Sequence, residues 1–131
     1  MSGGGSMPHK TKRSLCDYSC PVEAALDVIG GKWKGVIAFH LMEQGVLRFN
    51  EIRRQIPNAP RRTITRQLRE LESDGVIHRE VYPVVPPKVE YSLTEFGKTL
   101  APILVLLREW GDQYITDIKQ LRETSFESAN S

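Results

Sequence analysis

The 131-residue chain has a formal net charge of only +2, with 18 Lys and Arg residues against 16 Asp and Glu residues. This length fits one domain with one modest hydrophobic core. No apolar run approaches the ~20 residues that a membrane-spanning helix requires. The sequence also has no phosphate-binding loop and no Gly-x-Ser-x-Gly or His-Glu-x-x-His motif. We therefore expect a small non-enzymatic domain that does not enter a membrane.

Residues 1–14 are expected to lie outside the fold. The start, MSGGGS, resembles a cloning-tag remnant ahead of a native Met7, and it has no apolar segment of the kind found in signal peptides. Residues 8–14 contain Lys10, Lys12 and Arg13, and they are predicted to form a flexible basic arm. The folded domain is expected over residues 15–122.

Two amphipathic helices are predicted next. The first covers residues 21–29, ends at Gly30-Gly31 and turns Val22, Ala25, Leu26 and Ile29 inward. The second runs from Lys32 to Gly45, with Trp33 as a core anchor. Lys32 and Lys34 at its start are candidate contacts to a nucleic-acid backbone, and simple solvation of these charges is an equal alternative.

Residues 48–75 predict a helix-turn-helix. Phe49, Ile52 and Ile56 share one face of a short helix that Pro57 ends, and Asn58-Ala59 form the turn. A second helix starts at Pro60, in whose first turn a missing N–H costs nothing, and stops at Gly75. Its apolar residues recur at i, i+4 and i+7, at Ile64, Leu68 and Leu71. Two short helices joined by a tight turn have the geometry of a DNA-reading unit.

Positive charge is concentrated in this unit. Residues 48–69 contain seven arginines and one acidic residue, Glu51, so the remainder of the chain is net acidic. A local basic patch on a folded domain is typical of a surface that binds a polyanion. Arginine pairs with guanine edges or phosphates, and threonine contacts phosphates or thymine methyl groups. A solvated charged face is the alternative, and the single sign of the charge disfavours it.

The candidate DNA-binding residues fall into two groups. Base reading is predicted for Arg61, Arg62, Thr65 and Arg66, with Thr63 and Arg69 on the same helix. Phosphate contacts are predicted for Lys32, Lys34, Arg53 and Arg54, and for Arg79 and Lys88 of the hairpin described next. Asn50 is a further candidate DNA-binding residue.

Residues 76–93 predict a β-hairpin with a long tip. Residues 76–82 and 89–93 are rich in β-branched and aromatic residues, and Pro83, Pro86 and Pro87 stiffen the segment between them. A hairpin in this position is the wing of a winged helix-turn-helix. The predicted fold is therefore mainly α with a small β-hairpin wing (α+β).

The last helix is predicted from Glu95 to Arg122, with Thr94 as its cap and a break near Lys98–Thr99 because Pro102 interrupts the hydrogen-bond ladder. Its apolar stripe is longer than one small domain can cover. We therefore expect it to pair with the same helix of a second subunit, whereas folding back on its own domain is the alternative. Residues 123–131 are predicted to be a disordered tail. The expected homodimer interface consists of Val22, Leu26, Leu104, Leu107, Trp110, Tyr114 and Ile118.

Together these motifs resemble the HxlR-type bacterial transcriptional regulators, a winged-helix group close to the MarR proteins. The matching segments are Cys20-Pro21-Val22, Ile29-Gly30-Gly31-Lys32-Trp33, Arg48-Phe49-Asn50-Glu51-Ile52, residues 68–77 (LRELESDGVI) and residues 91–97 (YSLTEFG). The resemblance implies a cytoplasmic homodimer that joins through its first and last helices and places the Arg61–Arg69 helix in the major groove of a palindromic operator. Pro60 departs from the pattern, since the family often has a serine cap there.

Cys20 is the candidate redox sensor. Several members of the family sense oxidants or electrophiles through the cysteine before this proline, and Cys20 matches it by position. A thiol at a helix N-terminus feels the positive end of the helix dipole, which favours the reactive thiolate, whereas a nearby Glu23 would oppose it. Cys16 is a possible resolving partner, and an inert thiol is the equal alternative.

The remaining alternatives concern ligands and partners. Cys16 and Cys20 lack a second ligand pair at zinc spacing, and His9, His40 and His78 are expected to be structural or solvated, so no metal or cofactor is predicted. A small-molecule effector bound in a cavity between the long helices would replace thiol control. A winged helix used for protein–protein contact is the rival to DNA binding, and it would not need unopposed arginines.

Overall fold

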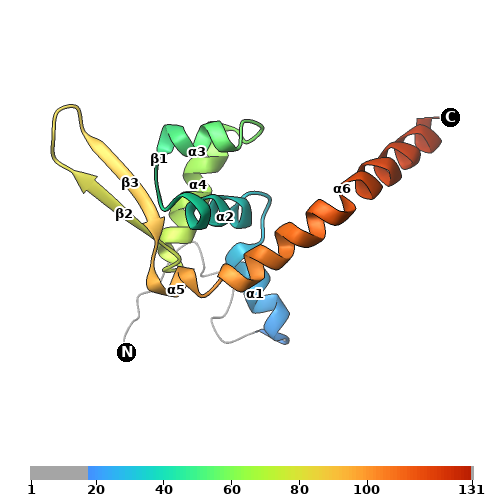
Figure 1. Ribbon diagram of the computed structural model, residues 1–131, viewed down its shortest axis with the longest axis horizontal. Helices are drawn as coiled ribbons and strands as arrows, with labels where there is room; N and C mark the ends of the chain where they lie inside the picture. Colours follow the sequence, from blue (N-terminus) through green and yellow to red (C-terminus); the bar gives the residue numbers. More distant parts are fainter. Residues whose placement is uncertain (1–17, 131) are drawn as a thin grey trace.

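The computed structural model describes residues 18–130, with side chains described to residue 127 (Figure 1). The predicted basic arm and Cys16 lie outside these residues. The order of elements is α1 (Pro21–Ile29), α2 (Lys34–Gln44), β1 (Val46–Arg48), α3 (Phe49–Gln55), α4 (Arg61–Ser73), β2 (Ile77–Tyr82), β3 (Lys88–Leu93), α5 (Glu95–Lys98) and α6 (Ala101–Asn130). A mainly helical domain with a small β wing is confirmed. No helix among the described residues is long and apolar enough to cross a membrane.

The wing belongs to a three-stranded antiparallel sheet with the order β1-β3-β2. The predicted hairpin is present, and it pairs Ile77 with Leu93 and Tyr82 with Lys88. The third strand, β1, pairs Val46 with Ser92 and was not predicted. Three residues are too few to show an alternating pattern, and the pairing with β3 alone makes them a strand.

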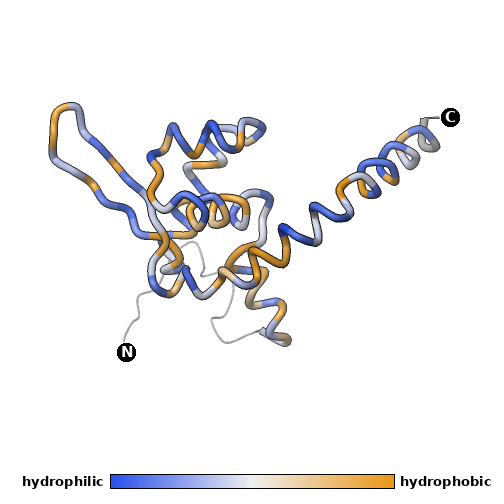
Figure 2. The backbone as a smooth tube through the Cα atoms, viewed as in Figure 1, coloured by the Kyte–Doolittle hydropathy of each residue, from blue (hydrophilic) through white to orange (hydrophobic). Residues whose placement is uncertain are grey.

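The core lies where α2, α3 and α4 meet the base of the sheet. Its most deeply buried large side chains are Ile37, Leu41, Ile52, Ile64, Leu71, Val76 and Ile77. Hydrophobic positions gather in the same region and along the first turns of α6 (Figure 2). Each such side chain contributes about 1.5–3 kcal/mol when it is fully buried. The two helices of the helix-turn-helix, α3 and α4, therefore supply part of the hydrophobic core and are fixed by it.

The end of α4 and the starts of α5 and α6 lie largely where the sequence predicts. Gly75 follows α4 with φ of +77°, a conformation that glycine adopts without steric cost. Thr94 caps α5, because its hydroxyl accepts a hydrogen bond from the Gly97 amide at 2.9 Å. The predicted break falls between α5 and α6, and Pro102 lies in the first turn of α6, where its missing donor leaves no bond unmade.

Helix α6 differs from the prediction at its far end. It continues to Asn130, beyond the expected end at Arg122, so the described part of the predicted disordered tail is helical. Its sequence from Glu123 contains no glycine or proline that would stop a helix. In Figure 1, α6 projects away from the rest of the molecule.

We predict that Gly97→Ala will destabilise the fold, whereas the same change at Gly111 will not. A Cβ atom at position 97 would lie 2.1 Å from the Val76 carbonyl oxygen, whereas a Cβ at position 111 would meet no atom within 4 Å. Overpacking costs about 1–3 kcal/mol, and replacing a glycine inside a helix by alanine gains up to about 1 kcal/mol. Denaturant unfolding of both variants at one protein concentration measures the difference. Equal changes in the free energy of unfolding would contradict this account.

Candidate nucleic-acid interface

Helix α4 presents an arginine-rich face to solvent. Arg62, Arg66 and Arg69 are exposed and recur at i, i+4 and i+7, opposite the buried Ile64 and Leu68. We call these three arginines the basic face of α4. Pro60 occupies the N-cap position, one residue before the first turn where it was expected, and no side chain caps the α4 amides there. The helix thus exposes a row of guanidinium groups along its length and unbonded amides at its start.

Helix α3 forms one flank of the basic face. Asn50, Arg53 and Arg54 are exposed and line a shallow hollow. Arg61 joins the two helices, since its guanidinium lies 4.9 Å from the centre of the Phe49 ring. A contact at this distance is a cation–π interaction. The predicted phosphate-contacting residues of α3 and the start of α4 are therefore adjacent.

The wing forms the other flank. Arg79 of β2 lines a second hollow together with Thr65, Arg69 and Glu72 of α4. The sequence did not show that Arg79 and Arg69 come together, because they lie on different elements. Thr63, the remaining predicted residue of α4, is only partly exposed.

Lys88 already has partners within the wing. Its ammonium lies 3.7 Å from a Glu90 carboxylate oxygen and 4.6 Å from the centre of the Tyr82 ring. A phenol of ordinary pKa is already protonated at neutral pH, and Glu90 raises the pKa of Tyr82 further, with smaller contributions from burial and from Glu80. Tyr82 is therefore a hydrogen-bond donor on the wing that the sequence reasoning did not single out.

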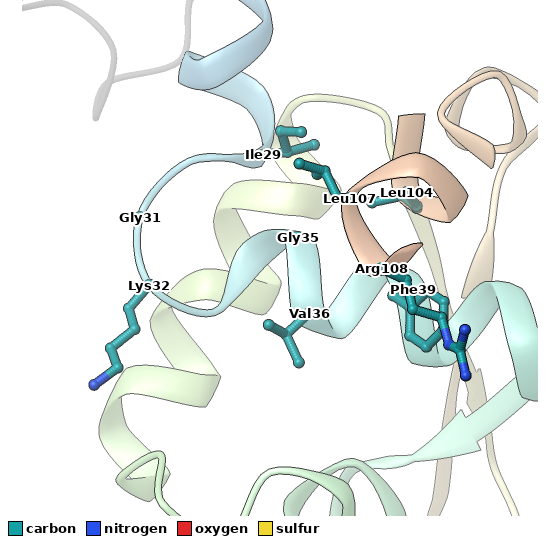
Figure 3. A pocket seen from close by; sticks show the side chains of 9 residues that line it. All are labelled: Ile29, Gly31, Lys32, Gly35, Val36, Phe39, Leu104, Leu107 and Arg108. Carbon is teal, nitrogen blue, oxygen red and sulfur yellow. The ribbon is translucent and has the colours of Figure 1, made fainter. Parts of the chain in front are cut away.

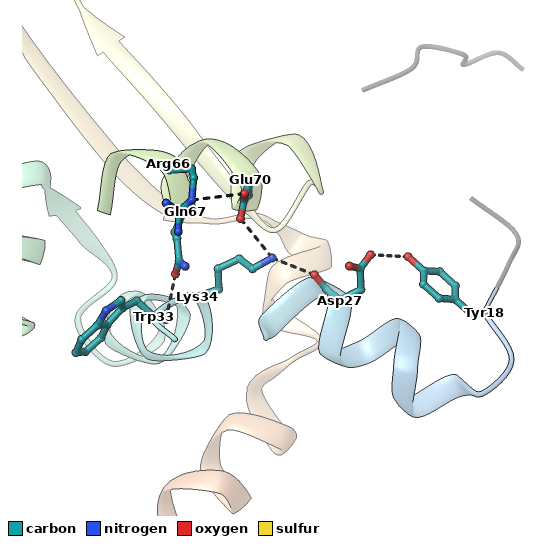
Figure 4. A network of polar contacts seen from close by, with 7 residues as sticks. All are labelled: Tyr18, Asp27, Trp33, Lys34, Arg66, Gln67 and Glu70. Atoms are coloured by element: carbon teal, nitrogen blue, oxygen red, sulfur yellow. Dashed lines mark hydrogen bonds and ion pairs between the residues drawn. The ribbon is translucent and has the colours of Figure 1, made fainter. Parts of the chain in front are cut away.

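The structure contradicts the prediction that Lys34 contacts phosphate. Lys34 is only 8% exposed, and its ammonium donates a hydrogen bond to the Asp27 carbonyl oxygen at 3.0 Å (Figure 4). A Glu70 carboxylate oxygen lies 3.6 Å from the same ammonium. Lys32 is exposed as expected, with its ammonium 5.3 Å from the centre of the Trp33 ring. Glu70 is 36 positions away from Lys34, so no local pattern indicated this pairing.

Helix α6 carries an exposed apolar stripe. It consists of Ile103, Leu107, Trp110, Tyr114, Ile118 and Leu121, which follow one another at spacings of three or four residues. All are exposed except Ile118, which is partly exposed, and Trp110 remains 58% accessible. The prediction that Val22 and Leu26 of α1 turn inward is wrong for this protomer, because both are exposed and only Ile29 of that helix is buried. The prediction that Leu104 lies at a dimer interface is wrong for this protomer, because Leu104 is only 2% exposed and packs within its own domain.

A hollow of about 320 Å³ lies between α2 and the first turns of α6 (Figure 3). Its lining residues are Ile29, Gly31, Lys32, Gly35, Val36, Phe39, Leu104, Leu107 and Arg108. Most of them are apolar, and the Lys32 side chain points away from the hydrophobic side chains in Figure 3. We call it the α2–α6 hollow. Through Leu107 it is continuous with the apolar stripe of α6.

Cys20 is a free, exposed thiol at the N-cap of α1. Its side chain makes no capping hydrogen bond. Glu23 instead closes the start of the helix, because its carboxylate accepts hydrogen bonds from the Ser19 amide at 2.9 Å and from the Ser19 hydroxyl at 3.0 Å. The thiol is thus accessible to a reagent in this protomer.

The two described histidines have ordinary structural surroundings. Burial lowers the pKa of His40, and Glu43 opposes that shift, while its ring meets Phe39 edge-on at 5.6 Å. His78 lies 2.7 Å from a Glu80 carboxylate oxygen on the exposed side of β2. Within residues 18–130, no group of three or more His, Cys, Asp or Glu side chains is arranged to hold a metal ion.

The arrangement of a winged helix-turn-helix with an arginine-rich second helix is matched by a family model, HxlR-like helix-turn-helix, over residues 28–119. The chain belongs to this HxlR-like family. The HTH-type transcriptional regulator YdeP of Bacillus subtilis is 59% identical over 111 residues, which cover 80% of this chain and 86% of YdeP. The protein is accordingly a helix-turn-helix transcriptional regulator and not an enzyme.

Solved structures give the same HxlR-like fold. The redox regulator HypR in its oxidised form is 62% identical, with a TM-score of 0.69 over 72% of this chain and 96% of that chain. The reduced form is 56% identical, with a TM-score of 0.71 over 77% of this chain and 99% of that chain. Both forms of HypR therefore resemble this chain over about three quarters of its length.

Proposed function

We propose that the protein is a homodimer that binds a pseudopalindromic DNA operator in the bacterial cytoplasm. The observation that carries this proposal is the exposed basic face of α4, where Arg62, Arg66 and Arg69 point away from the core. An α-helix fits the major groove of B-DNA, where arginine distinguishes guanine from the other bases. Within the described residues no ion pair engages Arg62 or Arg69. A surface for docking protein would not require arginines left unopposed in this way.

The flanks of α4 supply the contacts that set its register. Arg53 and Arg54 of α3 reach one strand of the duplex, and Arg79 of the wing reaches the other. Lys32 and Lys88 add positive charge near the groove, although Glu90 offsets part of the charge of Lys88. Such phosphate contacts position a protein and carry no sequence information. Base reading is therefore assigned to Arg61, Arg62, Thr65 and Arg66.

The second subunit docks on the apolar stripe of α6 and on Val22 and Leu26 of α1. These side chains form an apolar surface that a monomer in water rarely exposes. Their spacing of three or four residues is that of helices that pack side by side. A two-fold dimer also places two recognition helices about 34 Å apart, on one face of the duplex.

Control through Cys20 follows from its exposure and from the chain's similarity to HypR, which is described as a redox regulator. An oxidant that joins two thiols into a disulfide removes two protons and two electrons from them. Cys20 lies at the start of α1, which also supplies part of the proposed dimer interface. A disulfide there changes how the two subunits sit and hence the separation of the two α4 helices.

A small-molecule effector is the second candidate for control. The α2–α6 hollow favours it, because an apolar space of about 320 Å³ suits an organic ligand. The two routes are separated by Cys20→Ser, which abolishes a thiol response and leaves a response through the hollow intact.

We predict that Arg62→Ala will relax sequence preference, whereas Arg54→Ala will weaken binding to all sequences alike. The loss of a bidentate base contact costs about 1–3 kcal/mol of discrimination. The loss of one phosphate contact lowers the slope of log K against log salt by about one. Fluorescence anisotropy over a salt series compares a duplex selected by the wild-type protein from a random library with unselected duplex. Equal losses of Arg62→Ala on both duplexes would remove its base-reading role.

We predict that Trp110→Glu will shift the protein from dimer to monomer. The new carboxylate would be buried without a partner in the apolar stripe, which costs several kcal/mol. Thr116→Glu is the matched control, since it places the same charge on an exposed part of α6 that faces away from the stripe. Sedimentation equilibrium gives the masses, and circular dichroism checks the fold. A dimeric Trp110→Glu protein would show that α6 is not the interface.

We predict that diamide will alter DNA affinity in the wild-type protein and leave Cys20→Ser unaffected. Diamide accepts the two electrons and two protons as a disulfide forms. Intact mass under non-reducing conditions separates a disulfide within one chain, to Cys16, from one between two chains. Cys16→Ser is the control for this distinction, because it removes a disulfide within one chain and leaves a Cys20–Cys20 disulfide between two chains possible. A response of Cys20→Ser equal to that of the wild type would assign control elsewhere.

A further inference from the structure

Lys34 is a buried cation that the proposed DNA contacts do not use. It begins α2 and is only 8% exposed. Buried lysines are rare unless paired, because burial removes the hydration of the ammonium. A positive charge at a helix N-terminus is also disfavoured by the helix dipole. The contacts that compensate Lys34 therefore show what holds it in place.

Those contacts connect α1 to α4. The Lys34 ammonium donates to the Asp27 carbonyl oxygen of α1 at 3.0 Å and lies 3.6 Å from Oε1 of Glu70 on α4. The other oxygen of the Glu70 carboxylate lies 3.9 Å from Nε of Arg66, one turn back along α4 (Figure 4). One carboxylate thus lies between a buried ammonium and an arginine of the basic face of α4.

A second polar contact fixes the same turn against α4. The Trp33 amide donates a hydrogen bond to Oε1 of Gln67 at 3.0 Å, and Gln67 is buried. Gly31 makes room for this contact, since a Cβ atom there would lie 3.2 Å from Nε2 of Gln67, and its φ of +69° suits glycine. The turn between α1 and α2 is therefore clamped to α4 on the turn that carries Arg66.

We propose that Lys34 is a positioning residue for DNA reading, which sets the direction of the Arg66 guanidinium through Glu70. The inference rests on the proposed DNA-binding function. With Lys34 in place, Glu70 is anchored and Arg66 is ordered before DNA arrives, which lowers the cost of ordering it on binding. Without the ammonium, Glu70 has Arg66 as its nearest cation and draws the guanidinium away from the groove. Both effects lower discrimination at the base pair that Arg66 reads.

The first test needs no DNA. Lys34→Met keeps an unbranched apolar side chain and removes the charge, and Glu70→Gln keeps Lys34 and removes the carboxylate. We expect the ¹⁵N–¹H signal of Arg66 Nε, assigned with Arg66→Lys, to shift in both variants, while the Arg62 signal stays in place. Circular dichroism checks folding, and Lys34→Gln, which also removes the charge but keeps a polar side chain, carries the test if Lys34→Met does not fold; Glu70→Gln shows the size of the shift when the carboxylate itself is lost. An unchanged Arg66 signal in a folded variant would overturn the proposal.

The second test separates positioning from a direct phosphate contact. It uses a duplex selected by the wild-type protein from a random library, together with unselected duplex, over a salt series. We expect Lys34→Met to reduce the ratio of the two affinities about fivefold or more, with an unchanged salt slope and with no further reduction in an Arg66→Ala background. Parallel losses on both duplexes with a slope lowered by about one would make Lys34 a phosphate contact. Failure of the wild type to bind any duplex would defeat the proposed function, and the Arg66 signal would still report on Lys34.

Discussion

The burial of one narrow face of α4 determines where the arginines of that helix point. Ile64, Leu68 and Leu71 are buried to 2% exposure or less, so the helix cannot rotate without bringing polar groups into the core. A shift of one residue would turn the helix by about 100° and place charged side chains where these apolar ones lie. The direction of the basic face therefore depends on hydrophobic packing, and the guanidinium groups themselves are spared from any structural role apart from Arg61 and Arg66.

Three other parts of the protomer contact α4. Helix α3 contacts it through the Phe49 ring beneath Arg61, the wing approaches it at Arg69, and the turn between α1 and α2 is joined to it by Gln67. The first two parts carry exposed positive charge, and the third is buried and polar. Through Lys34 and Gln67 the helix proposed to read DNA is therefore also joined to the turn that follows α1.

The sequence predicted those elements whose signals are local. The i, i+4, i+7 spacing in α4, the β-branched and aromatic residues of the hairpin, Gly75 and Pro102 each act over a few residues, and each prediction agreed with the structure. The wrong predictions concern features that depend on residues far away in the sequence, or on the absence of a residue that would end a helix. Strand β1 exists because it pairs with β3, and Lys34 is buried because Glu70 and Asp27 receive its ammonium. The extension of α6 was missed because a polar Ser- and Glu-rich composition was interpreted as disorder.

Leu104 illustrates an error that helix geometry alone would have prevented. It follows Ile103 by one residue, which turns it about 100° away from Ile103, whereas the other members of the apolar stripe lie within about 60° of Ile103 around the helix axis. That rotation carries it from the apolar stripe to the side of α6 that faces α2. For the predicted site residues other than Lys34 and Leu104, the DNA and dimer contacts stay predictions. The exposure of a side chain in one protomer does not show which molecule it contacts.

The length of α6 connects the proposed dimer to the secondary structure of each chain. Residues 112–127 lie in a helix, yet nearly all of their side chains are exposed to solvent within the protomer. Helical segments of this length are marginally stable in water unless another surface packs on them. In the proposed dimer the partner provides that surface, so dilution unwinds the distal part of α6 while the winged domain stays folded. The number of copies in a cell would then set how much of each chain is helical.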